Sequence, residues 1–225
     1  MTVAACILAS SAEIALRDVD GTPNVRRLVD LAWAGGALPV VVVVSPDPQG
    51  AVAAALAGAP VVLAAPAAAD AGPAGQMARA IELACGEVDA TDAALLWPAG
   101  MGWLDAETVT SLIEAHGADR DALLRPAFRA TPGWPILLPV GRLPALRALS
   151  ADLGPEEISG ALATLLPTRS IELGDPGIVL GLDTPRDGLP RFEGPPEPPP
   201  DRRHEWGALV AAGPDEAPEP PATRD

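Results

Sequence analysis

Five consecutive valines, Val40 to Val44, constrain the fold of this chain more than any other feature of its sequence. A strand with one face in water alternates apolar and polar residues, whereas a continuous β-branched run is typical of a strand covered on both faces. Such strands occur in α/β proteins, where helices connect parallel strands and pack on both sides of the sheet. We therefore expect Pro39–Ser45 to be a buried strand of a mainly parallel sheet.

Short apolar runs and helical patterns alternate along the first 189 residues, as such a sheet requires. Asn24 can cap a helix that stops at Gly35-Gly36, and Asp105 can cap another that stops at Gly117. Further strands are expected at Val3–Ala9, Pro60–Ala65, Ala93–Pro98, Ala122–Phe128 and Trp134–Val140. Further helices are expected at Gln49–Gly58, Gly75–Cys85, Arg142–Leu149 and Pro155–Leu166, before Ser170–Leu173 and Gly177–Leu182 close the folded part. The order predicts an α/β fold with three layers, α/β/α.

The composition of the chain changes at about Pro190. From there to Asp225 the chain is rich in proline and acidic residues and has little to bury. We expect residues 1–189 to form one domain and residues 190–225 to form a disordered, Pro-rich acidic tail.

The net charge of −15 and the lack of lysine limit the partners of this chain. All 15 basic residues are arginines, and they form no basic cluster that would attract nucleic acid or an anionic lipid surface. The longest apolar run is too short to cross a bilayer, and the N-terminus lacks the basic leader of a signal peptide. We therefore expect no nucleic-acid or membrane partner and a cytoplasmic location. Cys6 and Cys85 lack metal-ligand spacing and are expected to be structural thiols.

Four segments carry patterns that point to a family. They are LRDVDGTPNVRRLVDLAWAGGALPVVVVV (Leu16–Val44), ALLWPAGMGWLDAETVTSLIEAHG (Ala94–Gly117), PGWPILLP (Pro132–Pro139) and DPGIVLGLDTPRD (Asp175–Asp187). In this order and spacing they resemble the MobA-like NTP transferases, and most closely the molybdenum-cofactor cytidylyltransferase branch. The DAET helix start and the DTPxD ending are the more specific parts of the resemblance.

The resemblance implies a Rossmann-like, nucleotide-diphospho-sugar transferase fold that binds a nucleotide at the carboxyl ends of its strands. It also implies a reaction in which a substrate phosphate attacks the α-phosphate of an NTP and pyrophosphate leaves. Because this reaction brings anionic groups together, the family uses a glycine-rich loop with basic residues, two aspartates and Mg²⁺ to neutralise them.

The loop after the first strand departs from the family pattern. In place of the glycine-rich turn with its Arg and Lys, the chain has Ser10 and Ser11 and a loop several residues shorter. Without glycines the backbone cannot easily wrap a triphosphate. Arg17 is the nearby residue that could replace a lost cation. We therefore take Ser10, Ser11 and Arg17 as the remnant of an NTP-binding loop, although the serines can equally cap a shortened turn.

The metal-binding positions also depart from the family pattern. Gly100 replaces the aspartate of the family's LPADMP motif, Gly181 replaces the first aspartate of DIDTPED, and Asp183 remains. A glycine offers no side-chain oxygen to Mg²⁺. Asp183 can still bind a metal, although its Asp-Thr-Pro step also makes a good turn, which is the role we favour. We expect Gly100 and Gly181 to face each other across the carboxyl edge of the sheet, with Asp183 nearby.

Large side chains are expected to fill the space that a nucleotide would occupy. Trp134 stands where the family has a histidine, and we expect it to gather with Trp97 and Trp103 at the mouth of this site. His116 falls on the buried stripe of its predicted helix, which favours a place in the core over a catalytic role.

Three functions are consistent with these residues. The leading hypothesis is a catalytically impaired MobA-like domain that persists as a binding or scaffold protein, with a nucleotide or a protein as partner, near molybdenum-cofactor chemistry. The second is an active, divergent nucleotidyltransferase that uses Mg²⁺ and gives new roles to Arg17, Asp183, and Asp20 or Asp18. The third is an interaction module that acts through its Pro-rich tail.

Overall fold

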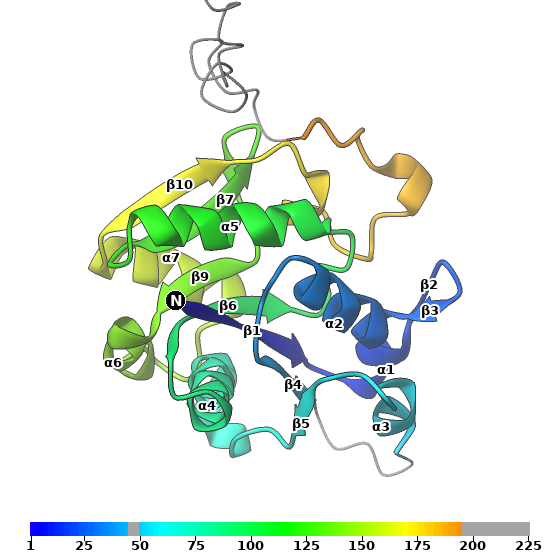
Figure 1. Cartoon of the computed structure of the whole chain (residues 1–225), viewed down its shortest axis with the longest axis horizontal. Coiled ribbons are helices and arrows are strands. Elements are labelled where there is room, and N and C mark those ends of the chain that lie inside the picture. Colours follow the sequence, from blue (N-terminus) through cyan, green and yellow to red (C-terminus); the bar gives the residue numbers. More distant parts are fainter. Residues whose placement is uncertain (45–49, 195–225) are drawn as a thin grey trace, which may run out of the picture. The chain divides into compact units, whose positions relative to one another are not determined.

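A mixed sheet is the centre of the computed structural model, which describes residues 1–44 and 50–194 (Figure 1). Its strands follow the order β10-β7-β9-β6-β1-β4-β5, with β8 paired to β7. The bounds of these strands are β1 Thr2–Ala9, β4 Val40–Val44, β5 Val62–Ala64, β6 Thr91–Pro98, β7 Leu123–Phe128, β8 Thr131–Pro132, β9 Ile136–Pro139 and β10 Thr168–Glu172. A separate small hairpin is formed by β2 (Asp18–Val19) and β3 (Thr22–Pro23).

Most strand pairs in the sheet are parallel, as predicted. Strand β1 runs parallel to both β4 and β6, and the pairs β4–β5 and β7–β10 are also parallel. Strands β8 and β9 are the exceptions: β9 runs antiparallel to both β6 and β7, and the short strand β8 runs antiparallel to β7. The chain reverses after β7 through Arg129 and Ala130, which both have positive φ, and a connection this short cannot make the crossover that a parallel strand needs.

Helices cover both faces of the sheet, which confirms the three-layer prediction. One apolar core packs the sheet against α2 (Asn24–Ala34), α3 (Ala51–Ala55) and α5 (Ala106–Ala118), and α1 (Ala12–Leu16) borders it. The other packs the sheet against α4 (Gly72–Glu87), α6 (Leu143–Arg147) and α7 (Pro155–Leu165). In Figure 1, α5 lies in front of the sheet and α7 behind it. Short 3₁₀ turns occupy Ala69–Ala71, Val140–Arg142, Pro176–Ile178 and Arg186–Gly188.

The valine run is buried as expected. All five valines of β4 are buried; Val40, Val42 and Val44 belong to the first core, and Val41 and Val43 belong to the second. Because successive side chains of a strand point to opposite faces, this division shows that both faces of β4 are covered.

The predicted helix ends are partly right. Asp105 caps α5 by accepting a hydrogen bond from the N–H of Glu107 at 2.9 Å, but Gly117 lies inside this helix, which ends one residue later. Asn24 is not a cap: Pro23 holds the cap position of α2, and Asn24 is the first helical residue, fully buried. Trp33, near the end of α2, is 38% exposed.

The domain boundary at Leu189 remains a prediction. Residues 190–194 still contact the domain, since the N–H of Glu193 donates to the carbonyl of Gly174 at 2.9 Å. The rest of the predicted tail, residues 195–225, lies outside the described residues. Within residues 1–44 and 50–194, no helix is long and apolar enough to cross a membrane.

The two cysteines differ in burial, which makes a testable difference in reactivity. Cys6 is fully buried in β1, and burial raises the pKa of its thiol far above the ordinary value. Cys85 in α4 is half-buried, and burial together with Glu82 raises the pKa of its thiol as well. Because the thiolate is the reactive form and must reach the reagent, Ellman's reagent should label one thiol slowly in the native chain. This labelling should disappear in a Cys85→Ser variant, and Cys6 should react only after the chain is unfolded. Rapid labelling of two thiols in the native protein would contradict this expectation.

Candidate functional site

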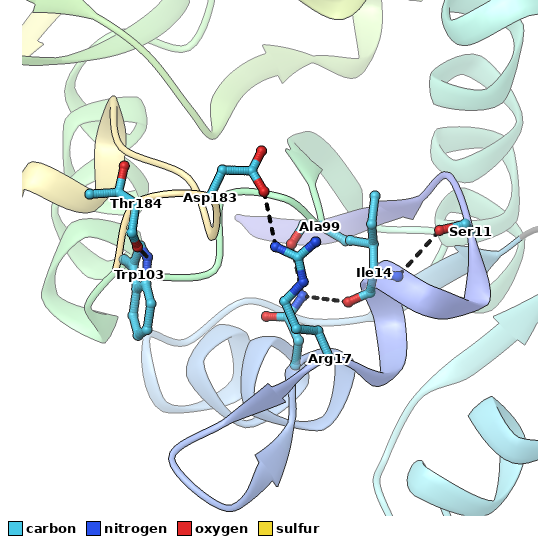
Figure 2. A network of polar contacts seen from close by, with 8 residues as sticks. Ser11, Ile14, Arg17, Ala99, Trp103, Asp183 and Thr184 are labelled. Carbon is cyan, nitrogen blue, oxygen red and sulfur yellow. Dashed lines mark hydrogen bonds and ion pairs between the residues drawn. The ribbon is translucent and has the colours of Figure 1, made fainter. Parts of the chain in front are cut away.

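The candidate residues meet where β1 and β6 end. Because these two strands are adjacent and parallel, the loop after Ala9 and the loop after Pro98 emerge side by side at one edge of the sheet. The turn at residues 181–184 joins them, because the N–H of Leu182 donates to the carbonyl of Gly100 at 2.8 Å. Figure 2 shows this region.

The loop after β1 is closed into a short helix. Ser11 caps α1, and its Oγ accepts a hydrogen bond from the N–H of Ile14 at 3.2 Å (Figure 2). The carbonyl of Ser11 also accepts from the N–H of Ala15, a fully buried residue. Ser10 is exposed and precedes the cap. Of the two roles considered for these serines, the structure therefore gives Ser11 the capping role.

Gly100 and Gly181 lie side by side, as expected. A Cβ atom added to Gly181 would lie 2.9 Å from the carbonyl oxygen of Gly100, so the backbones are nearly in contact. A Cβ added to Gly100 would meet no atom within 4 Å. The two glycines are therefore not equivalent, because an aspartate would fit freely at position 100 but would displace the backbone at position 181.

Arg17 and Asp183 form an ion pair across this edge. Arg17 Nη1 lies 3.1 Å from Asp183 Oδ1, and the side chain of Asp183 is 100% exposed whereas that of Arg17 is 36% exposed (Figure 2). A second ion pair joins the same two segments with the charges reversed, since Arg186 pairs with Asp20 in the turn between β2 and β3. Exposed ion pairs contribute little to stability. Their effect here is that the charge of Arg17 is already balanced by a carboxylate.

Asn24 and Arg27 fix the loop after β6, a role that no sequence pattern indicated. Asn24 Nδ2 donates to the carbonyls of Ala99 at 2.8 Å and Ile14 at 3.2 Å, while its buried Oδ1 has no hydrogen-bond partner in the described structure. Arg27 donates to the carbonyls of Gly102 and Leu104, and burial lowers the pKa of its guanidinium. These contacts hold the loop against α2.

Asp175 is a second buried anchor that sequence reasoning missed. One of its carboxylate oxygens accepts from the N–H of Asp105 at 2.9 Å and from the hydroxyl of Thr108 at 2.7 Å, and the other accepts from the N–H of Gly177 at 2.8 Å. Burial raises the pKa of this carboxyl group. Asp175 belongs to the Asp-Pro-Gly step of the segment that resembles the family, and this step was the sequence feature that could have indicated a structural role for Asp175. It joins the start of α5 to the segment that carries Gly181.

The three tryptophans do not gather at the site, so this expectation is wrong. Trp97 packs in the first core and Trp134 in the second, on opposite faces of the sheet. Trp103 reaches the edge, where its Nε1 donates to the carbonyl of Thr184 at 3.0 Å (Figure 2). The alternation of side chains along each strand accounts for this separation, because Trp97 shares its face of β6 with Leu95 in the first core, whereas Trp134 packs with Ile136 in the second.

His116 lies in the core, as expected. It is buried near the end of α5, and its Nε2 lies 3.8 Å from Asp92 Oδ1. Burial lowers the pKa of the imidazole and exceeds the opposing effect of Asp92.

The residues at this edge do not fit a divalent metal ion. Mg²⁺ and Mn²⁺ prefer several oxygen ligands, at least one of them a carboxylate. Asp183 is the carboxylate beside the two glycines, and it is paired with Arg17. In the part of the chain that the structure describes, no group of three or more His, Cys, Asp or Glu side chains could hold a metal.

Comparisons with known proteins agree on one family of folds. The profile of the MobA-like NTP transferase domain matches residues 13–165. The chain is similar to the structure of Rv0371c from Mycobacterium tuberculosis H37Rv in complex with manganese, with a TM-score of 0.66 and 16% identity over 84% of this chain and 98% of that one. A nucleotidyl transferase from Methanothermobacter thermautotroptrophicus gives a TM-score of 0.60 and 15% identity over 81% and 92% of the two chains.

A third similar structure is CMP:2-keto-3-deoxy-manno-octonic acid synthetase complexed with CTP, with a TM-score of 0.63 and 13% identity over 82% of this chain and 94% of that one. At such identities the three structures share the fold of this chain. No curated protein sequence matches it.

Proposed function

This chain belongs to the MobA-like NTP transferase family, and we propose that it has lost nucleotidyl transfer and serves as a binding or scaffold protein near molybdenum-cofactor chemistry. One observation supports this proposal above the others. At the edge where the family binds its nucleotide, the nearby cation, Arg17, is paired with Asp183 beside two glycines, Gly100 and Gly181.

The chemistry of nucleotidyl transfer explains why this pairing matters. A triphosphate and a phosphorylated acceptor must approach each other, and cations, backbone N–H groups and a metal ion must neutralise their charge in the transition state. Here Arg17 would have to exchange Asp183 for a phosphate, and Ser11 already uses its Oγ to cap α1. Losing a single electrostatic donor commonly lowers the rate by a factor on the order of 10²–10³. Several such losses at one site leave little activity, although the effects do not simply multiply.

The second candidate function is a divergent nucleotidyltransferase. The similar M. tuberculosis structure contains manganese and the similar synthetase contains CTP, so the fold can hold both a metal and a nucleotide. The two ion pairs that Arg17 and Asp20 make are on the surface and could rearrange around a ligand. Asp18 is engaged by the N–H of Gly21 at 3.1 Å, inside the small hairpin. The third hypothesis, an interaction module that acts through its Pro-rich tail, depends mainly on residues 195–225, which lie outside the described structure.

A pyrophosphate-release assay tests the proposed loss of activity. We expect no release from Mg-CTP or Mg-GTP with a molybdopterin acceptor, either by the natural chain or by a Gly100→Asp/Gly181→Asp variant. The variant should stay inactive because the loop after β1 still lacks the glycines and cations that hold phosphates, and because an aspartate at position 181 displaces the backbone; a Gly100→Asp single variant, where the side chain has room, should be inactive for the first reason alone. An active cytidylyltransferase of the family is the positive control. Turnover by the natural chain that disappears in Asp183→Ala would favour the divergent enzyme.

A further inference from the structure

Strands β10 and β5 are the two ends of the sheet (Figure 1). Within residues 1–44 and 50–194, no strand pairs with the outer side of either one. A free edge strand exposes a row of backbone N–H and C=O groups that can pair with another chain, and proteins usually protect such edges. The two edges of this sheet differ in that protection.

The β5 edge is protected. The strand has only three residues, Val62–Ala64, and it lies between Pro60 and Pro66. Just beyond the strand, Arg79 Nε donates to the carbonyl of Ala65 at 3.1 Å. Because proline has no N–H to donate and the strand is short, this edge offers little to another chain.

The β10 edge is open. Four of the five residues of Thr168–Glu172 are exposed. Two hydrogen bonds of 2.8 Å join its ends to β7: the N–H of Leu123 donates to the carbonyl of Pro167, and the N–H of Leu173 donates to the carbonyl of Ala127. Because the backbone groups of successive residues in a strand point to opposite sides, the odd-numbered residues face β7. The even-numbered residues direct their N–H and C=O groups outward; these are Thr168, Ser170 and Glu172.

The open part of this edge has defined ends. Pro167 precedes it, and the carbonyl of Gly174 accepts from the N–H of Glu193 at 2.9 Å. Large apolar side chains are exposed near both ends, because Leu165 is 60% exposed and Phe192 is 38% exposed. The outward residues between these ends are spaced symmetrically about Ser170, so the edge is complementary to a second copy of itself.

We propose that the β10 edge pairs antiparallel with the β10 edge of a second copy of this chain, about a two-fold axis at Ser170. In this register Ser170 lies opposite its own copy and Thr168 lies opposite Glu172, so every outward group finds a partner. Arg169 lies opposite Ile171, and no like charges meet. An axis at Arg169 would instead set two guanidinium groups opposite each other, which is unfavourable.

The same axis brings the start of β10 in one chain to the end of β10 in the other. Leu165 of one chain therefore comes to the end of the edge where the second copy carries Phe192, and both side chains lose exposed apolar surface. The pairing is independent of the edge that carries Arg17, so it holds whether or not that edge binds a nucleotide.

Sedimentation equilibrium of the full chain tests the proposal. At a protein concentration of roughly 100 µM the mass should approach twice that of the chain, since edge pairing buries a small interface of modest affinity. The net charge of −15 opposes association, so the dimer fraction should be larger in about 0.5 M NaCl than in about 0.05 M NaCl. Ser170→Lys sets two ammonium groups opposite each other and should give a monomer. The matched control is Leu63→Lys on β5, where Leu63 is 39% exposed, and it should leave the dimer intact.

Disulfide cross-linking in a Cys85→Ser background tests the register. Ser170→Cys should form an intermolecular disulfide under mild oxidation, because directly opposite Cα atoms in a hydrogen-bonded pair are about 5.5 Å apart. Thr168→Cys alone should not, because its copy lies roughly 13 Å further along the strands. Combining Thr168→Cys with Glu172→Cys should restore the cross-link.

A natural chain that remains monomeric at both salt concentrations would overturn the proposal. A Ser170→Lys chain that dimerises as well as the natural chain, or a Leu63→Lys chain that loses the dimer, would place the interface elsewhere. Equal cross-linking of Ser170→Cys and Thr168→Cys would exclude the two-fold axis at Ser170.

Discussion

Replacing Asp175 by alanine should lower the free energy of unfolding by roughly 3 kcal/mol or more. The substitution removes the acceptor of three donors, the N–H groups of Asp105 and Gly177 and the hydroxyl of Thr108. Each buried donor left without an acceptor costs about 1–3 kcal/mol. Removing the carboxylate also relieves its own desolvation, but three unsatisfied donors outweigh that gain. Urea denaturation followed by circular dichroism measures the difference.

Two further variants make this prediction sharper. Asp183→Ala removes an exposed carboxylate from the same C-terminal segment and should leave the unfolding free energy nearly unchanged. Asp175→Asn keeps an acceptor for part of the cluster and should be intermediate. An Asp175→Ala chain as stable as Asp183→Ala would show that the three hydrogen bonds do not support the fold.

The raised pKa of Asp175 also predicts a pH dependence. Because burial raises its pKa, the folded chain binds this proton more tightly than the unfolded chain does. The resulting stability is fully present below the ordinary carboxyl pKa and is lost as the pH rises through the raised pKa. The natural chain should therefore gain stability relative to Asp175→Asn as the pH falls through this range. A difference between the two chains that is independent of pH would contradict this.

Replacing Trp134 by alanine should cost about 3–5 kcal/mol of unfolding free energy. Its side chain is fully buried in the second core, and its Nε1 donates to Glu156 Oε1 at 2.6 Å. The variant would leave a large cavity between the sheet and α7 and an unpaired glutamate. Trp134→Phe keeps most of the volume and should cost less, because it loses mainly the hydrogen bond.

Trp33 is the matched control for this substitution. It also makes one hydrogen bond, from its Nε1 to the carbonyl of Pro60 at 2.8 Å, but it is 38% exposed. Trp33→Ala should therefore destabilise the chain much less than Trp134→Ala in the same denaturation experiment. Equal losses would mean that Trp134 is not packed as described.

Local sequence patterns predicted much of the fold because helix caps and strand alternation depend on residues that are close together in the chain. The valine run indicated a strand covered on both faces, and Asp105 indicated a helix start, since a cap bonds to a neighbour two residues away. The antiparallel direction of β9 was not predictable in the same way. It follows from a turn at Arg129 and Ala130, neither of which has the sequence signal of a left-handed turn residue.

The candidate site could be predicted where strand ends bring residues together. Gly100 and Gly181 were expected to be neighbours because their segments resemble parts of the family that converge, and the Leu182–Gly100 hydrogen bond confirms it. The Arg17–Asp183 ion pair joins residues 166 positions apart, and neither residue carries a local signal of the other. Asn24 was misjudged for the same reason: its position suggested a cap, whereas its contacts are with distant carbonyls.

Calorimetric titration of the natural chain with Mg-CTP and Mg-GTP shows whether the edge beside Arg17 still binds a nucleotide. Arg17 is paired with Asp183, and the resemblance places two glycines, Gly100 and Gly181, at the positions of the family's metal-binding aspartates, so we expect no binding in the micromolar range. The overall charge of −15 adds a repulsion that salt partly screens. Micromolar binding that requires the metal and disappears in both Arg17→Ala and Asp183→Ala would contradict the account, because the edge would then be a working nucleotide site.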